Sequence, residues 1–524
     1  MENTPQNWEW EQTGEQPVKE LYVLDKKDTA FALCAVAASV FAAVFGICGG
    51  FALGYLLSIV FMLAVFAFYF GKGNKKRMWP VLCGLLSLAN SAVFVCTSNG
   101  SVRFFGVVIS FLLALVCFDG LLHGGAKGNR QTMGVFLSAL STMGNIGVSV
   151  RSLFSNENGD KKTLSKVLVG VLCAVPVLLV VVPLLISSDD AFHGMKNKIF
   201  DNTSETFFKV LLGLVLSLFV IAYGFSLKAD TAKKVKEGRA GGVENVYLIS
   251  FLSAIGLCYV LYLFSQLAYF FSAFRGFLPD GEITYAQYAR KGFFEMCAIA
   301  TINLGIVFLA MIIAKKENGK VCPGIRAVAT FIAAFTLLII ATAIYKMVLY
   351  IGAYGMTVLR LTTSAFMVFL AIVFISVILR IYITKINIVK TGLVAAGCIV
   401  LLLGTANVNR VCAAYNYESY KSGRLQTIDV DALYDLGYEG IPYLVALASE
   451  GNGHAEAKQW LWVAFRGEHG DYFETLPAEI STDFASEDMK EYEKHTGFSY
   501  YSIPRAKAYA SLYQFLDENP GWLK

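Results

Sequence analysis

The residues best suited to chemistry open one apolar stretch of the chain, in the run TYAQYARKGFFE. Tyr285 and Tyr288 are three residues apart and Lys291 and Glu295 are four apart, so a helix places each pair on one face. The planar guanidinium of Arg290 suits bidentate binding of an anion. One interpretation is a site for an anionic headgroup or a polar ligand. The other, which we favour, is a belt of Tyr and Arg that anchors a helix at the membrane interface.

A second polar group occurs later in the chain, where Tyr350, Tyr354 and Arg360 flank a stretch with two glycines. We expect Gly352 and Gly355 to break the helix there. A broken backbone near a membrane can line a binding site, but more often it is the turn of a helical hairpin. The sequence leaves both interpretations open and favours the hairpin turn.

Two aspartates complete the candidate residues. Asp189 lies in a predicted loop on the same side as both polar groups, and convergence of all three would form a ligand-binding rim. Asp119 is an ionisable residue within an apolar run, LVCFDGLL. It is either part of a proton or cation relay or an interfacial carboxylate that reaches water. We favour the second, because one carboxylate without a partner makes a poor pathway.

Patterns of known catalytic chemistry do not occur in the chain. We find no phosphate-binding G-x-x-x-x-G-K-[ST] loop, no H-E-x-x-H and no G-x-S-x-G. The five histidines and eleven cysteines show neither zinc-ligand spacing nor a C-x-x-C pair. The sequence therefore predicts no catalytic residue, no metal and no cofactor, and it favours a protein that is not an enzyme.

The composition indicates the class of protein that must position these side chains. Of 524 residues, 56% are hydrophobic and 16% are charged, and the mean hydropathy is +0.56. A soluble domain is about 25% charged, so an ordinary soluble enzyme and a disordered chain are both excluded. Basic residues are in excess before residue 407, in short clusters between apolar runs, and acidic residues are in excess after it. We expect the lipid bilayer as partner and no nucleic acid.

Uncharged runs of about 20 residues predict the membrane spans. The run from Ala30 to Phe70 is long enough for two, with Gly49 and Gly50 at the break. In all we predict eleven spans, at 30–48, 51–70, 79–96, 104–122, 167–186, 207–226, 245–272, 293–314, 327–349, 357–381 and 391–406.

Lys and Arg gather in alternate loops, which predicts the topology. The tail 1–29 is then cytoplasmic, 30–406 is the membrane domain of a bacterial cytoplasmic membrane protein, and 407–524 is an acidic extracytoplasmic domain. Polar and apolar residues recur at helical spacing in 131–154, which we interpret as an amphipathic helix lying in the cytoplasmic interface. The fold class is thus all-α, a polytopic bundle with a small C-terminal helical soluble domain.

Within 407–524, three segments have helical patterns and are separated by glycines: 441–449, 455–465 and 504–516. We expect a short helical array there. An acidic, tyrosine-rich domain suits contact with another envelope protein, which is the partner that we expect for this segment. The sequence leaves the oligomeric state open.

Several stretches together resemble one bacterial family. They are TYAQYARKGFFE, LYIGAYGMTVLRLTTSAFMVFLA, LISSDDAF, YNYES and IDVDALYDLGYEGIPYLVAL. The chain is similar, over roughly residues 165–450, to multi-pass inner-membrane proteins grouped as the domains of unknown function 4153 and 4173. The resemblance implies the architecture and transfers no reaction, ligand or catalytic residue.

Three functions agree with these features. The first is a non-enzymatic envelope scaffold or sensor with an extracytoplasmic interaction domain. The second is a transporter or channel for a small solute or ion, against which stand the few intramembrane charges and the lack of an inverted repeat. The third is a membrane enzyme acting on a lipid-linked substrate, for which no acid–base pair at a defined spacing is found.

Overall fold

The computed structural model describes most of the membrane helices and part of the C-terminal segment. The described residues are 25–47, 53–70, 78–123, 129–142, 146–153, 203–228, 243–274, 293–317, 320–383, 385–450, 455–468 and 503–519. They fall into two compact units. The smaller unit comprises 1–40 and 139–232, and the larger comprises 41–138 and 233–524.

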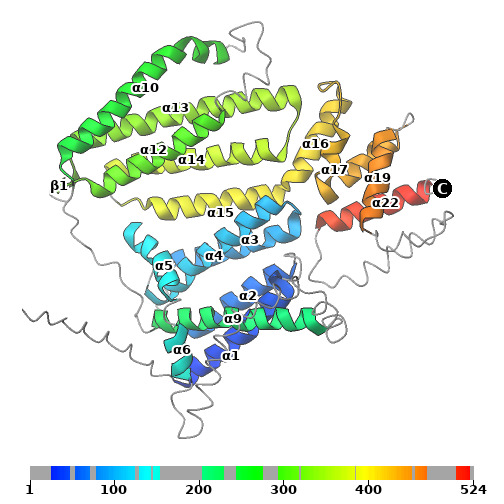
Figure 1. Ribbon diagram of the computed structural model, residues 1–524, viewed down its shortest axis with the longest axis horizontal. Coiled ribbons are helices and arrows are strands. Elements are labelled where there is room, and N and C mark those ends of the chain that lie inside the picture. Colours follow the sequence, from blue (N-terminus) through cyan, green and yellow to red (C-terminus); the bar gives the residue numbers. More distant parts are fainter. Residues whose placement is uncertain are drawn as a thin grey trace, which may run out of the picture. The chain divides into compact units, whose positions relative to one another are not determined.

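The larger unit is built from long helices packed side by side (Figure 1). Neighbours in sequence are often neighbours in space, and α15 closes the array by packing against both α3 and α4. The helices are α2 (Leu53–Phe70), α3 (Met78–Cys96), α4 (Gly100–His123), α10 (Asn245–Phe274), α12 (Phe293–Ile313), α13 (Pro323–Tyr354), α14 (Val358–Tyr382) and α15 (Ile388–Ala406). A short π-helix, η1 (Ala42–Ile47), packs against α2. Two short strands, β1 (Lys316–Glu317) and β2 (Lys320–Val321), pair antiparallel between α12 and α13.

Among the described residues, nine helices are long and apolar enough to cross a membrane. They coincide with nine of the predicted spans. The predicted span 293–314 forms α12, whose apolar part, Glu295–Met311, is shorter than the other nine. The predicted span 167–186 lies outside the described residues. The chain is therefore a multi-span helical membrane protein.

The segment predicted as one amphipathic helix, 131–154, contains two. They are α5 (Asn129–Ser141) and α6 (Ile146–Leu153). With 13 and 8 residues, both are shorter than the ~20 residues that a span requires. Their position in the interface stays a prediction.

Local sequence explains where the helices of the larger unit begin and end. α13 starts with Pro323, whose missing N–H costs nothing in the first turn, and ends before Gly355, whose φ is 79°. The side chain of Thr357 caps α14 by accepting from the N–H of Arg360, and Asn387 does the same for α15 with the N–H of Lys390.

In the smaller unit, an ion pair joins the ends of two helices, α1 (Lys26–Phe41) and α9 (Thr203–Lys228). The Lys228 Nζ atom lies 2.6 Å from Asp28 Oδ1 and 3.2 Å from Asp25 Oδ2. Asp28 is only 1% exposed. The first turn of α1 and the last turn of α9 are therefore in contact, and their predicted location on the cytoplasmic side stays a prediction.

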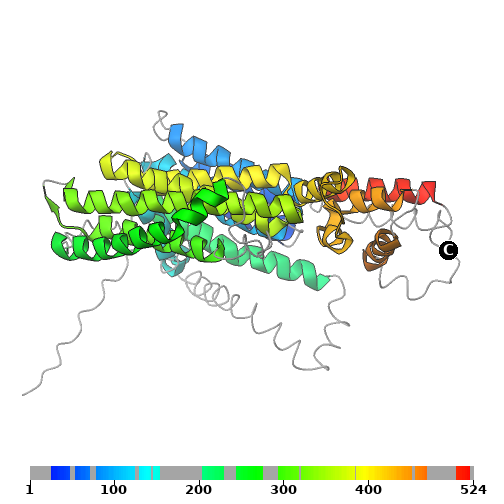
Figure 2. The ribbon, with the colours of Figure 1, turned by 90° about the horizontal axis from the view of Figure 1, so that it is seen from above.

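The C-terminal helices lie beyond one end of the helical array of the larger unit (Figures 1 and 2). They are α16 (Val408–Lys421), α17 (Val430–Tyr434), the 3-10 helix η3 (Gly437–Glu439), α18 (Ile441–Ala448), α19 (Ala455–Glu468) and α22 (Ile503–Glu518). The three C-terminal helices that the sequence predicts are α18, α19 and α22. One buried cluster contains Val93 and Val102 from the array as well as Leu444 and Leu512 from the C-terminal helices. The domain boundary at 407 stays a prediction.

Candidate functional site

One residue joins the last membrane helix to the C-terminal helices. Asn407 ends α15 and begins α16, with a φ of 58°, in the left-handed region. Its side-chain oxygen accepts from the N–H of Arg410, and its side-chain nitrogen donates to the Cys96 carbonyl, 2.8 Å away. Asn tolerates this backbone conformation better than most residues because its short polar side chain bonds locally. Asn407 therefore caps α16 and at the same time ties it to the end of α3.

The turn between α3 and α4 is held by two side chains from the C-terminal helices. The carboxylate of Glu439, 5% exposed, accepts from the backbone N–H of Ser98 at 2.9 Å and from its hydroxyl. The Asn99 amide donates to Asn409 Oδ1 at 2.8 Å, and Asn409 in turn donates to the Leu436 carbonyl. Buried polar groups are stable only when paired in this way.

A second attachment is made at the turn between α13 and α14. The side-chain oxygen of Asn416 accepts from the Met356 N–H at 2.7 Å, while its amide nitrogen donates to the Met356 carbonyl at 2.8 Å. One amide thus satisfies both backbone groups of a single residue. The two contacting residues come from YNYES and LYIGAYGMTVLR, two stretches that carry the family resemblance.

These contacts join segments that the charge pattern predicts to lie on one side of the membrane. The turns at 97–99 and 355–357 and the segment after 407 are predicted to lie on one side. Ser98 contacts Glu439 at the first turn, and Met356 contacts Asn416 at the second. On the opposite side, Asn387 donates to Thr132. Which of the two sides faces the cytoplasm stays a prediction.

The predicted cluster of Tyr350, Tyr354 and Arg360 does assemble. The Arg360 guanidinium lies 4.0 Å from the centroid of the Tyr350 ring, and its Nη1 atom donates to the carbonyls of Tyr354 and Gly355. Arg360 thereby satisfies carbonyls at the C-terminal end of α13. The expectation that Gly352 breaks the helix is wrong, since α13 continues to Tyr354 and ends before Gly355.

Of the other predicted site residues, the structure describes Glu295 and Asp119. Tyr285, Tyr288, Arg290 and Asp189 lie outside the described residues. Glu295 is exposed in the first turn of α12, and Asp119 is half-buried near the end of α4. The rim formed by both clusters with Asp189 stays a prediction.

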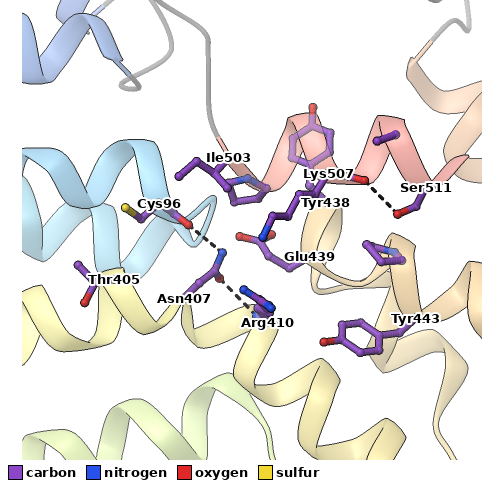
Figure 3. A pocket seen from close by; sticks show the side chains of 13 residues that line it. Cys96, Thr405, Asn407, Arg410, Tyr438, Glu439, Tyr443, Ile503, Lys507 and Ser511 are labelled. Carbon is purple, nitrogen blue, oxygen red and sulfur yellow. Dashed lines mark hydrogen bonds between the residues drawn. The ribbon is translucent and has the colours of Figure 1, made fainter. Parts of the chain in front are cut away.

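A pocket of about 490 Å³ lies between the end of the array and the C-terminal helices (Figure 3). Its wall includes Cys96 and Thr405, at the ends of α3 and α15, so it lies at the level where these candidate spans end. From the C-terminal helices come both acidic and basic side chains. They are Arg410, Glu439 and Lys507.

The charged side chains in this pocket differ in whether they have partners. Glu439 is bound by Ser98, and it also lies close enough to Arg103 for the two charges to interact. Arg410 and Lys507 are exposed, and within the described part of the chain neither side chain has a hydrogen bond or an ion pair. The carboxylate is therefore compensated and the two cations are not.

Sequence reasoning missed these residues. Glu439 and Lys507 occur in patterns typical of exposed helical turns, and neither is near an apolar span in sequence. A usable signal was the predicted sidedness, which places TSNG and DLGYEG on one side. This sidedness limits the segments that can contact Ser98 to those on the same side, but it does not identify Glu439 among them.

In the described residues, no three His, Cys, Asp or Glu side chains are grouped to hold a metal. The apolar helices define an integral membrane protein with many spans and a C-terminal helical extension. Within that class, the chain belongs to the family described as a domain of unknown function, DUF4153, whose model matches residues 82–447. The match begins before the resemblance seen in the sequence and includes the turn with Ser98. No curated protein and no solved structure matches the chain.

Proposed function

We propose that this protein is a non-enzymatic scaffold or sensor of the bacterial envelope. In this proposal the N-terminus is cytoplasmic, and the C-terminal helices form an extracytoplasmic interaction domain. The observation that carries it is the attachment of these helices through Glu439 and Asn416 to two separate turns of the helical array. A domain held at two points keeps a fixed orientation relative to those turns, which a scaffold or sensor requires.

The shared core supports the same proposal. Cys412 and Leu444 are fully buried in a cluster that continues into α3 and α4. A tethered domain would need only the covalent connection, whereas here apolar surface is buried along the junction. Because packed interfaces move as discrete units, a partner bound at the C-terminal helices would act on the helices of the array that share this core.

The test uses a photo-crosslinking residue at Gln514, exposed on α22, in living cells. The control places it at Leu402, which is 66% exposed on α15, on a candidate span. We expect a discrete protein adduct from Gln514 alone, and we expect it to weaken with Glu439→Ala, which loosens the attachment. The proposal is contradicted if the same adducts form at both positions, or if the yield of the Gln514 adduct does not change with Glu439→Ala. In parallel, alkaline phosphatase and fluorescent-reporter fusions at Lys524 test on which side of the membrane the C-terminal helices lie.

A transporter or channel is the second candidate, and one observation favours it. Asn90 is fully buried in α3, and its side-chain oxygen has no hydrogen-bond partner among the described residues. The amide nitrogen donates to the Leu86 carbonyl, so the oxygen alone is left for a polar path through the span. Solute or ion flux in liposomes that contain the purified protein, lost with Asn90→Leu, would support this candidate over the scaffold.

A further inference from the structure

The pocket beside Asn407 combines three unengaged donors with a position at the membrane edge. Arg410 and Lys507 reach into it from α16 and α22, and Tyr443 points its hydroxyl into it from α18 (Figure 3). Within the described residues, no hydrogen bond or ion pair engages any of these three end groups. The Tyr443 ring is held by Tyr417, with centroids 5.6 Å apart, so its orientation is fixed by packing.

The donor chemistry favours one class of ligand. A guanidinium fork binds two oxygens of a phosphate at once, an ammonium adds a point charge, and a phenol adds a neutral donor. The one carboxylate in the wall, Glu439, has its oxygens occupied by Ser98. These oxygens therefore do not compete with an anion for Arg410 and Lys507, and the negative charge of Glu439 interacts with Arg103.

The size and level of the pocket agree with this chemistry. A volume of about 490 Å³ falls in the range of small-ligand sites, which is about 300–1,000 Å³. Cys96 and Thr405 place one wall at the ends of two candidate spans. A lipid phosphate lies at that level of a bilayer, and basic pockets at membrane edges bind anionic headgroups.

We propose that this pocket binds a phosphate-bearing anion through Arg410, Lys507 and Tyr443. The phosphate belongs either to the headgroup of a membrane lipid or to a free phosphorylated compound. The site lies apart from the predicted Tyr350 and Arg360 cluster, and it adds a ligand class that the scaffold proposal does not include.

The experiment uses the full-length protein with two probes. It is reconstituted in nanodiscs of phosphatidylcholine with or without phosphatidylglycerol, re-extracted, and the retained phosphatidylglycerol is counted by native mass spectrometry. In detergent, the same protein is titrated with inorganic phosphate. The variants are the double substitution R410Q/K507Q and the single Y443F, and the control is K458Q, an exposed lysine on α19 outside the pocket.

We expect at least tenfold weaker binding in R410Q/K507Q, since hydrogen bonds to charged groups are the strong ones, and roughly threefold weaker binding in Y443F. K458Q should bind as the unmodified protein does. Retention of phosphatidylglycerol that excess inorganic phosphate does not displace identifies the lipid source. Saturable binding of inorganic phosphate without lipid retention identifies a free compound.

The proposal is overturned if both probes bind equally to the unmodified protein, R410Q/K507Q and K458Q, or if neither probe binds. Arg410 and Lys507 are exposed, so their substitution leaves the core intact, and unchanged thermal unfolding of the double variant confirms this. Y443F keeps the ring that packs against Tyr417, so a loss there reports on the hydroxyl alone.

Discussion

The carboxylate of Glu439 accepts a hydrogen bond from the backbone N–H of Ser98, 341 positions earlier in the chain, at 2.9 Å. The pair joins the turn after α3 to the C-terminal helices, which follow α15. Because the carboxylate oxygens are engaged by Ser98, they do not compete with a bound anion for Arg410 and Lys507, which line the same pocket. One contact therefore serves both the attachment and the electrostatics of the candidate site.

Removal of this carboxylate should loosen the C-terminal helices. Glu439→Ala leaves the part-buried Ser98 N–H without this partner, at a cost of about 1–3 kcal/mol. We expect a lower thermal unfolding midpoint and faster proteolysis after residue 407. Glu456→Ala, an exposed position on α19, is the control and should change stability by less than about 0.5 kcal/mol. Equal proteolysis of both variants would argue against the attachment.

Two glycines three residues apart should respond in opposite ways. Gly355 has a φ of +79°, and an added Cβ would lie 2.7 Å from Asn416 Oδ1. Gly355→Ala should destabilise by about 1–3 kcal/mol. Gly352 lies in α13 with nothing within 4 Å of an added Cβ, so Gly352→Ala should be neutral or stabilise by about 0.5–1 kcal/mol. Thermal unfolding of the two purified variants decides, and a stabilising Gly355→Ala would contradict the geometry.

Cys412 should make stability depend on alkaline pH. Burial raises the pKa of its thiol from 9.0 to about 12 in the folded protein. The unfolded thiol ionises first, so the stabilisation that is complete below pH 9.0 is lost as pH rises toward about 12. Denaturant unfolding at pH 8 and pH 10 should show this loss, and Cys412→Ala should reduce the slope. A maleimide should label Cys412 only after unfolding.

The ion pair of the smaller unit should tolerate exchange better than removal. Asp28 is 1% exposed and Lys228 has a side chain that is 42% exposed. Asp28→Asn leaves the lysine without its closest counter-charge and should destabilise by about 1–3 kcal/mol. The exchange Asp28→Lys with Lys228→Asp should recover part of this loss. Asp25→Asn is the control, because Asp25 is exposed and its distance to Lys228 is longer, 3.2 Å. Thermal unfolding of each variant gives the comparison, and an exchange no more stable than Asp28→Asn would show that the pair itself is unimportant.

The membrane helices are predictable because hydropathy acts locally. α14 and α15 contain long apolar runs, and the polar caps Thr357 and Asn387 stand directly before them. α16 is harder to foresee, since VNRVCAAYNYESYK mixes polar and apolar residues and its helix depends on the Asn407 cap and on burial of Cys412.

The candidate site could be predicted only in part. Tyr350, Tyr354 and Arg360 lie within one turn and its flanks, so their spacing brings them together. Glu439 meets Ser98 through packing of distant segments, and no periodicity encodes such a pair. The amide of Asn416 likewise selects Met356 by tertiary position alone.

The single-residue joint at Asn407 makes the length of α15 a specified quantity. Each residue added to an α-helix turns its end by about 100° and advances it by about 1.5 Å. Since α16 begins where α15 ends, an insertion would swing α16 around the bundle and carry Arg410 and Asn416 away from the groups they face. The number of residues between Asn387 and Asn407 therefore sets the direction in which α16 leaves the end of α15, and with it the orientation of the C-terminal helices.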